Sequence, residues 1–144
     1  MAARYVDYML GEGAKRPFKH HYGDAGWDLY ASRPVTVGPG ETVDVHTDIY
    51  ISMPPRLYAR ITGRSSSLRK HRLLVNGGII DNGYRGELFV CVHNMGEEAG
   101  EVRPGMRLAQ VLFHVIEDVR WSEVDVLPGS PDGRGEGGFG STGE

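Results

Sequence analysis

The chain has 144 residues and a formal net charge of −3. A single domain of this length can bury a sizeable core. The acidic balance argues against a general polynucleotide-binding protein, because such proteins usually carry a net basic surface. We therefore expect no nucleic-acid partner.

Cysteine content and hydropathy indicate the compartment. Cys91 is the only cysteine, so no disulfide can form within the chain, and its place in an apolar run predicts a packed, reduced thiol. Residues 1–21 contain no apolar run typical of a signal peptide, and no stretch is long and apolar enough to span a bilayer. These features predict a soluble, cytoplasmic protein without membrane association.

Apolar patterning predicts many short strands, several turns and one helix. The expected strands cover residues 5–10, 25–31, 35–37, 42–53, 57–61, 88–92, 107–116 and 122–127, and the expected helix covers residues 63–74. This content predicts an all-β fold, an antiparallel barrel or sandwich. Run 88–92 lacks alternation, so we expect both of its faces to be buried, one of them by another subunit. The predicted domain spans residues 1–128.

Several polar residues interrupt the first half of the chain. Asp28 lies within an apolar run, so it is either exposed on an edge strand or buried with a partner. Asp44, His46 and Asp48 share one face of a strand, which we interpret as a solvated face rather than a site. The pair at residues 20–21, His-His, lacks further ligands at useful spacing, so we interpret it as a solvated loop rather than a metal site.

The expected helix begins with three serines after Arg64. Serine is a favoured N-cap residue, and free N–H groups beside hydroxyls and an arginine suit an anion. The pattern fits an anion site and an ordinary capped helix equally well.

Residues 77–87 contain one carboxylate, Asp81, at a chain reversal. Asn82-Gly83 favours positive φ and so marks a tight turn, and an apolar strand follows. A carboxylate held beside a rigid strand can orient and deprotonate a water molecule, or it can simply cap the turn. This stretch alone does not decide between the two roles.

After Pro128 the composition changes to glycine, serine, proline and charged residues, with too little apolar surface to fold unaided. We predict that residues 129–144 form a flexible tail. Within it, residues 134–143 carry one cation, one aromatic ring and two hydroxyls, an arrangement that a simple linker does not need.

Five of these stretches, in this order, resemble the five motifs of the trimeric dUTP pyrophosphatases, or dUTPases. The stretches are residues 25–31, 63–68, 78–87, 107–110 and 134–143. The resemblance implies a jelly-roll-like β-clip fold, a homotrimer with sites at subunit interfaces, and Mg²⁺-dependent hydrolysis of dUTP to dUMP and pyrophosphate. Such an activity keeps uracil out of DNA and supplies dUMP for dTMP synthesis.

The resemblance also implies roles for individual residues. Asp81 matches the aspartate that activates the water for attack on the α-phosphorus, and Asp28 matches a buried acid near that water and the hydration shell of the metal. In the family Mg²⁺ is held by the triphosphate and waters, with no direct protein ligand, in keeping with its reluctance to lose water.

Substrate-binding residues follow in the same way. Tyr84 matches the ring that packs against the deoxyribose, while Asn76 and the backbone of Ile79, Ile80 and Phe89 would contact the uracil edge. The residues implied for the phosphates are Arg64, Ser65, Ser66 and Gln110. The tail would close over the site. Its implied site residues are Arg134, Phe139, Gly140, Ser141 and Thr142, and Phe139 would stack on the base.

The chain departs from the common family pattern at three points. Gly83 stands where many members have a second acid, the hairpin tip around Asn76 is one residue shorter than a common form, and the second motif has an extra serine. Two rivals remain: a dCTP deaminase on the same fold, and a dUTPase-fold binding protein that uses nucleotide occupancy as a switch.

Overall fold

The computed structural model describes residues 2–138 and 140 and confirms the all-β prediction. Within these residues the chain forms ten strands and one short helix. The strands are β1 (Asp7–Leu10), β2 (Trp27–Tyr30), β3 (Val35–Val37), β4 (Thr42–Ser52), β5 (Leu57–Gly63), β6 (Leu73–Val75), β7 (Gly78–Ile80), β8 (Glu87–Asn94), β9 (Gly100–Val102) and β10 (Arg107–Val115), and the helix is α1 (Ser65–His71).

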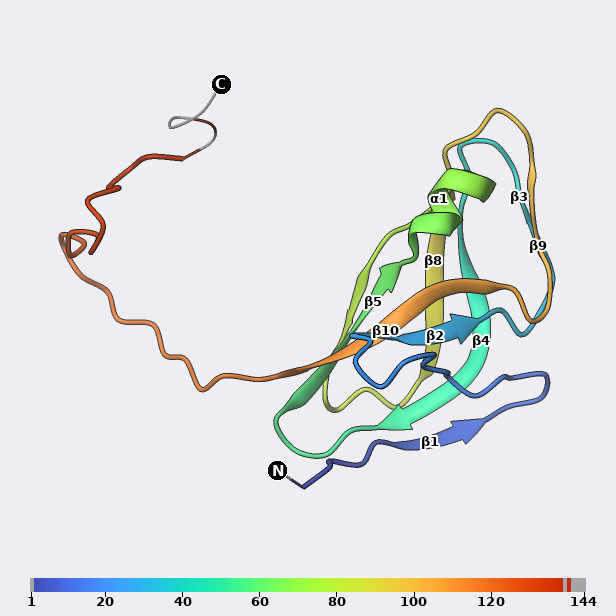
Figure 1. Ribbon diagram of the computed structural model, residues 1–144, viewed down its shortest axis with the longest axis horizontal. Coiled ribbons are helices and arrows are strands. Elements are labelled where there is room, and N and C mark those ends of the chain that lie inside the picture. Colours follow the sequence, from blue (N-terminus) through green and yellow to red (C-terminus); the bar gives the residue numbers. More distant parts are fainter. Residues whose placement is uncertain (1, 139, 141–144) are drawn as a thin grey trace.

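The strands make two four-stranded sheets, in the orders β1-β4-β8-β6 and β2-β10-β5-β7, and a small β3-β9 ribbon (Figure 1). Every pairing is antiparallel. Apolar side chains from both sheets form one core, among them Leu29, Val45, Ile61, Val90 and Val111. This is the sandwich that the alternating sequence predicts, because each strand directs every second side chain inward.

Strand β8 is covered by its own chain on one face only. Its side chains alternate between buried Leu88, Val90 and Val92 and the more open Phe89 and Cys91. The other face of β8, which carries Phe89 and Cys91, is only partly covered in a single chain. Burial raises the pKa of the Cys91 thiol, as expected for a packed cysteine.

Helix α1 is shorter than predicted and begins differently. Its N-cap residue is Arg64, in extended conformation, and no side chain caps the first turn. The expectation of a serine cap is thus wrong: the Ser67 hydroxyl instead donates to the Leu108 carbonyl, 2.7 Å away, and is buried. The helix ends at Arg72, whose φ of 57° turns the chain into β6.

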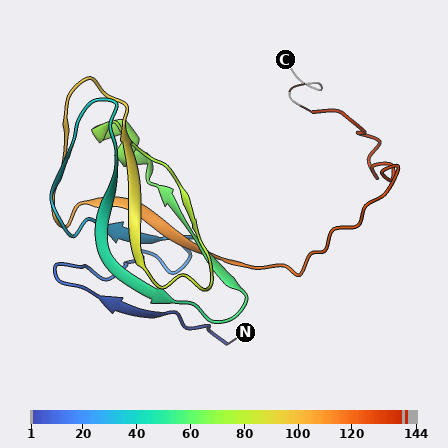
Figure 2. The same ribbon diagram turned by 180° about the vertical axis from the view of Figure 1, so that it is seen from behind.

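The predicted strand at residues 122–127 is absent from the described chain. After β10 the chain leaves the body as an extended arm (Figures 1 and 2). Val119, Trp121, Val126 and Leu127 are exposed on it. No strand among residues 2–138 lies beside this segment to complete a ladder, which explains why its strand-like sequence forms none. None of the described helices is long and apolar enough to cross a membrane.

Candidate active site

Asp28 lies on β2, an edge strand, yet its side chain is only 13% exposed. Two guanidinium groups and one imidazole surround its carboxylate. Arg64 Nε is 3.2 Å from Oδ1, and Arg107 Nη1 and His20 Nε2 are 3.4 and 3.5 Å from Oδ2. Of the two alternatives that the sequence offered for this acid, the structure selects burial with partners.

A cavity of about 340 Å³ opens beside Asp28. It is lined by Phe18, His20, Asp24, Ala25, Gly26, Asp28, Arg64, Ser65 and Gln110. Gly26 packs closely here, because a Cβ at this position would force the Gln110 amide to move. The structure thus brings together predicted residues from three separate stretches, and we call this group the Asp28 cavity.

The phosphate-binding residues predicted at the helix are held by short polar contacts. Arg64 Nη1 donates to the Ser66 hydroxyl over 3.3 Å while its Nε contacts Asp28. Gln110 Nε2 lies 3.4 Å from the Gly63 carbonyl. The Arg64 guanidinium lines the cavity together with Ser65 and Gln110, and the Arg107 guanidinium contacts Asp28, an environment suited to a polyanion.

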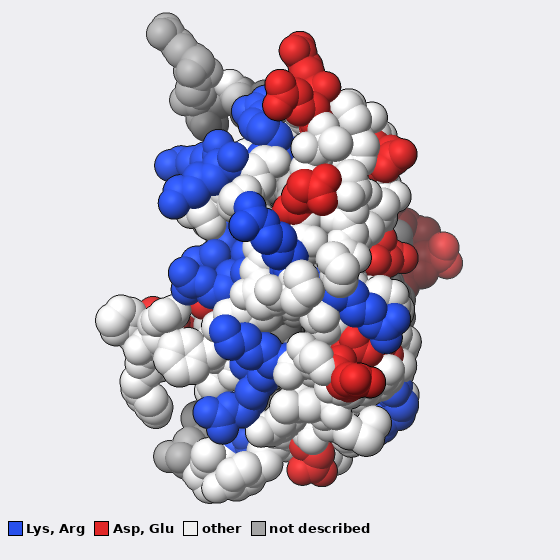
Figure 3. Space-filling view, turned by 90° about the vertical axis from the view of Figure 1, so that its right-hand side faces the viewer, with Lys and Arg blue, Asp and Glu red and all other residues white. Residues whose placement is uncertain are grey.

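Charge is unevenly distributed on the surface as well. Figure 3 views the molecule from the right-hand side of Figure 1 and shows Lys and Arg side chains gathered along one edge of this face, with Asp and Glu prominent toward the other. The net charge of −3 therefore conceals a local excess of positive charge. A local basic cluster of this kind is compatible with an acidic protein that binds a small anion.

Asp81 stands at the turn that follows β7, with its side chain exposed. The Tyr84 N–H donates to the Asp81 carbonyl over 3.0 Å and closes the turn. Asn82 fixes the turn to the body, since its Nδ2 donates to the carbonyls of Pro54 (2.8 Å) and Leu57 (2.9 Å). The turn is rigid, and the carboxylate that it presents is free for a ligand or water.

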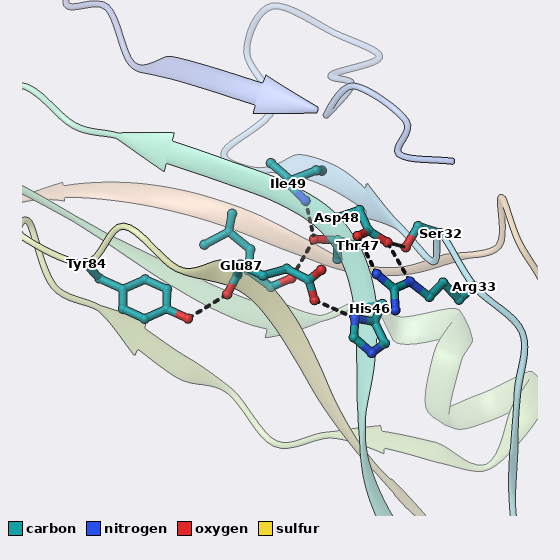
Figure 4. Close-up of polar contacts among 9 residues, drawn as sticks. Ser32, Arg33, His46, Thr47, Asp48, Ile49, Tyr84 and Glu87 are labelled. Carbon is teal, nitrogen blue, oxygen red and sulfur yellow. Dashed lines mark hydrogen bonds and ion pairs between the residues drawn. The ribbon is translucent and has the colours of Figure 1, made fainter. Parts of the chain in front are cut away.

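Tyr84 lies on the same turn and is 40% exposed. Its hydroxyl donates to the Glu87 carbonyl over 2.8 Å (Figure 4). Gly86 provides the space for this ring, because an added Cβ would overlap the phenol. The aromatic face is therefore presented in one orientation, as a surface for packing needs.

The two arms around this turn belong to different sheets. β7 pairs with β5, whereas β8 pairs with β4 and, at its far end, with β6. The Asn76 N–H bonds the Cys91 carbonyl (2.9 Å) where the arms diverge, and no ladder joins β7 to β8 in the described chain. Backbone groups of Ile79, Ile80 and Phe89 thus line two facing edges that are not paired with each other.

The Asp28 cavity and the Asp81 turn lie far apart in one chain. Across the sheet, Asp28 pairs with Gln110 of β10, and Gln110 pairs with Thr62 of β5. On the other side of β5, Ala59 pairs with Ile80, the residue just before Asp81. The two carboxylates are therefore separated by about four residues, about 13 Å, along the strands, and by three strand spacings, about 14 Å, across the sheet. One chain does not bring the predicted catalytic residues together.

In the arm, Arg134 Nε donates to the Gly137 carbonyl, and its N–H donates to Asp132 Oδ1 over 3.0 Å. Gly140 has a φ of +87°. Neither residue lines the Asp28 cavity in this chain. The predicted residues Phe139, Ser141 and Thr142 lie outside the described residues.

The solvated face predicted for Asp44, His46 and Asp48 is wrong at its last member. Asp48 has a φ of 52° at an irregularity in the β4–β8 pairing, and this turns its side chain inward. Arg33 Nη2 donates to Oδ1 over 2.8 Å and the Ser32 hydroxyl donates to Oδ2 (Figure 4). The bond from Arg33, then that from Ser32, lowers the pKa of Asp48 to about 2.

His46 and Glu87 lie next to Asp48, and His46 Nδ1 is 2.7 Å from Glu87 Oε2. The three side chains offer potential metal-ligand atoms within 4.8 Å of one another. However, both Asp48 oxygens are already bonded, and Arg33 supplies the balancing charge. We interpret this group, the Asp48 cluster, as an ion-pair cluster that stabilises the sheet.

The comparisons with known proteins decide what this architecture belongs to. The family model for dUTPase matches residues 13–143, which cover the Asp28 cavity, the Asp81 turn and the tail. The chain belongs to the dUTPase family. This confirms the family that the five sequence stretches resemble, the enzyme class of nucleotide hydrolase and the jelly-roll-like fold.

Individual dUTPases are similar over most of the chain. It is 42% identical over 136 residues to a deoxyuridine 5′-triphosphate nucleotidohydrolase of Clostridium kluyveri, with 93% of this chain and 94% of that protein covered. The mitochondrial enzyme of Homo sapiens is 40% identical over 135 residues, and the match covers 94% of this chain but about half, 53%, of the human protein. A Staphylococcus bacteriophage 80alpha dUTPase structure with dUPNHPP superimposes with a TM-score of 0.91 at 26% identity, covering 99% of this chain and all of that one.

Sequence reasoning missed two residues that the structure places in these two regions. Asn82 was interpreted only as a turn former, although its amide anchors the turn to the segment between β4 and β5. His20 was assigned to a solvated loop, although it lines the Asp28 cavity. No local pattern marks either contact, because the partners of Asn82 are about 25 residues away and that of His20 is Arg107, 87 residues away.

Proposed function

We propose that this dUTPase hydrolyses dUTP to dUMP and pyrophosphate in sites assembled from more than one copy of the chain. The observation that carries the proposal is the separation of the Asp28 cavity from the Asp81 turn, which lie at opposite edges of one sheet. A triphosphate in the Asp28 cavity and a nucleoside at the Asp81 turn can belong to one substrate molecule only if the cavity of one copy lies next to the turn of another.

The Asp81 turn supplies the nucleoside subsite and the base. The free carboxylate of Asp81 accepts a proton from water as the water oxygen bonds to the α-phosphorus, and the bond from that phosphorus to the pyrophosphate oxygen breaks. The rigid turn is suited to this role because orientation of the attacking water contributes much of the rate in phosphoryl transfer. Asp28 orients water on the phosphate side.

Uracil binds between the facing edges of β7 and β8. Its edge alternates acceptor, donor and acceptor, which backbone groups of Ile79, Ile80 and Phe89, with Asn76, complement. The Tyr84 ring packs against the deoxyribose and excludes a 2′-hydroxyl. Cytosine presents a different donor and acceptor pattern, so its binding leaves polar groups unpaired, and such mismatches discriminate strongly.

The Asp28 cavity binds the phosphates through Arg64, Ser65, Ser66 and Gln110. Arg64 and Arg107 already flank the Asp28 carboxylate, so this group of residues fits a Mg²⁺ ion that would arrive on the triphosphate with its own waters and need no protein ligand. When bound, Mg²⁺ neutralises phosphate charge and favours departure of pyrophosphate. The protein groups hold the phosphates in line with the attacking water.

The C-terminal arm completes the site. Its exposed Val119, Trp121, Val126 and Leu127 would be covered by docking on a neighbouring copy, and the open face of β8 provides a second apolar surface for contact. We propose a homotrimer in which the arm delivers the tail to a site on another copy. There Arg134, Gly140, Ser141 and Thr142 bind the terminal phosphates and Phe139 stacks on uracil. The reduced Cys91 thiol suits the cytoplasm, where we place the protein.

One assay tests the activity. Pyrophosphate and ammonia release are measured with dUTP, dCTP, dTTP and UTP in the presence of Mg²⁺. We expect pyrophosphate from dUTP alone and no ammonia. Ammonia from dCTP would identify a deaminase, and no turnover of any nucleotide would favour the nucleotide-binding protein.

Mixing damaged chains tests the shared site. Asp81→Asn and Arg64→Ala chains are each expected to be nearly inactive, but hybrids formed by denaturing and refolding them together should regain activity. In such a hybrid some sites combine an intact turn with an intact cavity. The matched control mixes Arg64→Ala with Asp28→Asn, which damages the same half in both chains. Recovery in the control, or none in the hybrid of interest, would refute sharing.

A further inference from the structure

The loop before β2 holds His20 in a defined place beside Asp28. Phe18 and Asp28 exchange two backbone hydrogen bonds, with Phe18 N–H donating over 3.2 Å and Asp28 N–H over 2.6 Å. The Phe18 ring meets the His20 imidazole edge to face, with ring centroids 4.8 Å apart. These contacts fix the imidazole at the mouth of the Asp28 cavity.

The contacts of His20 define its protonation state. Its Nε2 atom is 2.8 Å from Arg107 Nη1. A guanidinium group has only donors, so Nε2 must offer a lone pair and accept this bond. The imidazole is then neutral, with its proton on Nδ1. The same Arg107 nitrogen contacts Asp28 Oδ2 over 3.4 Å, so Arg107 is held between the imidazole and the carboxylate.

We propose that His20 is a positioning residue of this site, whose neutral imidazole holds the Arg107 guanidinium against Asp28. The inference rests on the proposed function, because it assigns Asp28 and its cavity to the phosphate side of the dUTP site. Arg107 links β10 to β2 at this point, and its orientation sets how one face of the cavity presents positive charge to a phosphate.

Protonation of His20 reverses the arrangement. Nε2 gains a proton, the bond from Arg107 is replaced by repulsion between two cations, and the new N–H faces Asp28 Oδ2 at 3.5 Å. The imidazolium and Arg107 then compete for one carboxylate. The other charged groups near the imidazole are Arg64 on the far side of Asp28, Asp24 in the same cavity, and Lys19, whose ammonium lies over the Trp27 ring.

Two variants separate the positioning role from a general structural one. In His20→Gln the amide oxygen can still accept from Arg107, but the side chain does not titrate. His20→Ala removes the acceptor. His21→Ala is the matched control, because the His21 side chain is exposed and its contact with Asp24 is made by the backbone N–H.

The experiment measures kcat/KM for dUTP between pH 5.5 and 8.5 with each full-length variant. At pH 8 we expect kcat/KM of His20→Ala to be about ten-fold lower than that of the parent, which corresponds to the loss of one hydrogen bond to a charged group. We expect kcat/KM of His20→Gln and of the His21→Ala control to stay within about two-fold of the parent. The kcat/KM of the parent, divided by that of His20→Gln, should fall as the pH drops through the range in which histidine side chains titrate, because only the parent releases Arg107. A ratio that is constant with pH, or an Ala variant no worse than the control, would overturn the inference.

A spectroscopic readout keeps the inference separate from the activity. Long-range ¹H–¹⁵N spectra of imidazole nitrogens at neutral pH should show the His20 proton on Nδ1 in the parent. In Arg107→Ala the form with the proton on Nε2 should grow. A parent with the proton on Nε2 refutes the positioning role even if dUTP is hydrolysed. If dUTP is not hydrolysed but the tautomer is as expected, the proposed function fails and the His20–Arg107 contact stands.

Discussion

The Asp28 cavity and the Asp81 turn differ in how their polar side chains are held. In the cavity the side chains contact one another: Asp28 has two arginines and one histidine as neighbours from its own chain. At the turn the scaffold residues Asn82 and Tyr84 bond backbone carbonyls, while the carboxylate of Asp81 faces solvent. The cavity is thus preassembled within one chain, whereas the turn presents a rigid but open group.

This difference is the reason why we propose Asp81, rather than Asp28, as the base. Cationic groups lie beside both oxygens of Asp28, an arrangement that suits the orientation of water and phosphate. Asp81 has open oxygens, which a proton acceptor needs. Variants that treat the two regions separately should therefore have distinct effects.

The largest expected effect follows removal of the base. Asp81→Asn keeps the shape of the turn but cannot take the proton, so kcat should fall about 10²- to 10⁴-fold. Binding of a non-hydrolysable dUTP analogue, measured by calorimetry, should be retained, because the turn and the cavity are intact.

Asp7→Asn is the control, since Asp7 is exposed on β1, away from either region. We expect parental kcat for it. An Asp81→Asn enzyme with unchanged kcat would show that the free carboxylate only caps its turn, and the comparison between the two regions would lose its functional meaning.

Removal of residues 133–144 should have the next largest effect. Deletion takes away Arg134 and the tail groups proposed to bind the terminal phosphates. Loss of one bond to a charged phosphate corresponds to about 10- to 100-fold in kcat/KM. Sedimentation should give the same oligomer as the parent, because the apolar residues at 119–127 are retained. A fully active truncated enzyme would mean that the Asp28 cavity needs no cover.

The sequence predicted most of the body but not every boundary. Alternation of apolar and polar residues determines which face of a strand is buried, so the sandwich follows from it. Residues 122–127 have the same alternation but lack a neighbouring strand in the chain, and pairing cannot be deduced from one segment alone. The serine cap was wrongly predicted: no side chain caps the helix, and the Ser67 hydroxyl donates to the Leu108 carbonyl, 41 residues away in the sequence.

Prediction of the site had the same limit. Asp28, Arg64 and Gln110 were found from their local motifs, and the structure brings them together. Asp48 was misassigned, because the irregularity in β4 reverses the direction of its side chain and period-two reasoning assumes a regular strand. Asn82 and His20 act through distant partners that only folding reveals.

A moderate effect should follow loosening of the Asp81 turn. Asn82→Ala removes two hydrogen bonds to the body, which should lower the free energy of unfolding by about 1–3 kcal/mol and reduce kcat several-fold. Gly83→Ala is the matched control in the same turn, because an added Cβ meets no atom within 4 Å. If both variants behaved like the parent in thermal unfolding and kinetics, the rigidity of the turn would be irrelevant to catalysis.

The smallest effect on activity should come from the Asp48 cluster. Like the Asp28 cavity it pairs a carboxylate with an arginine beside a histidine, but both oxygens of Asp48 are already bonded. Asp48→Asn tolerates the φ of 52°, because asparagine readily adopts this region. It should leave kcat/KM unchanged and cost about 1 kcal/mol in unfolding free energy, since half of Arg33 is in solvent. The pKa of Asp48 is lowered to about 2, so its contribution is fully present above pH 4 and is lost as the pH falls toward 2. Thermal unfolding of parent and variant should therefore converge over that window, and a gap that persists at pH 2 would show that the carboxylate charge is not what stabilises the cluster.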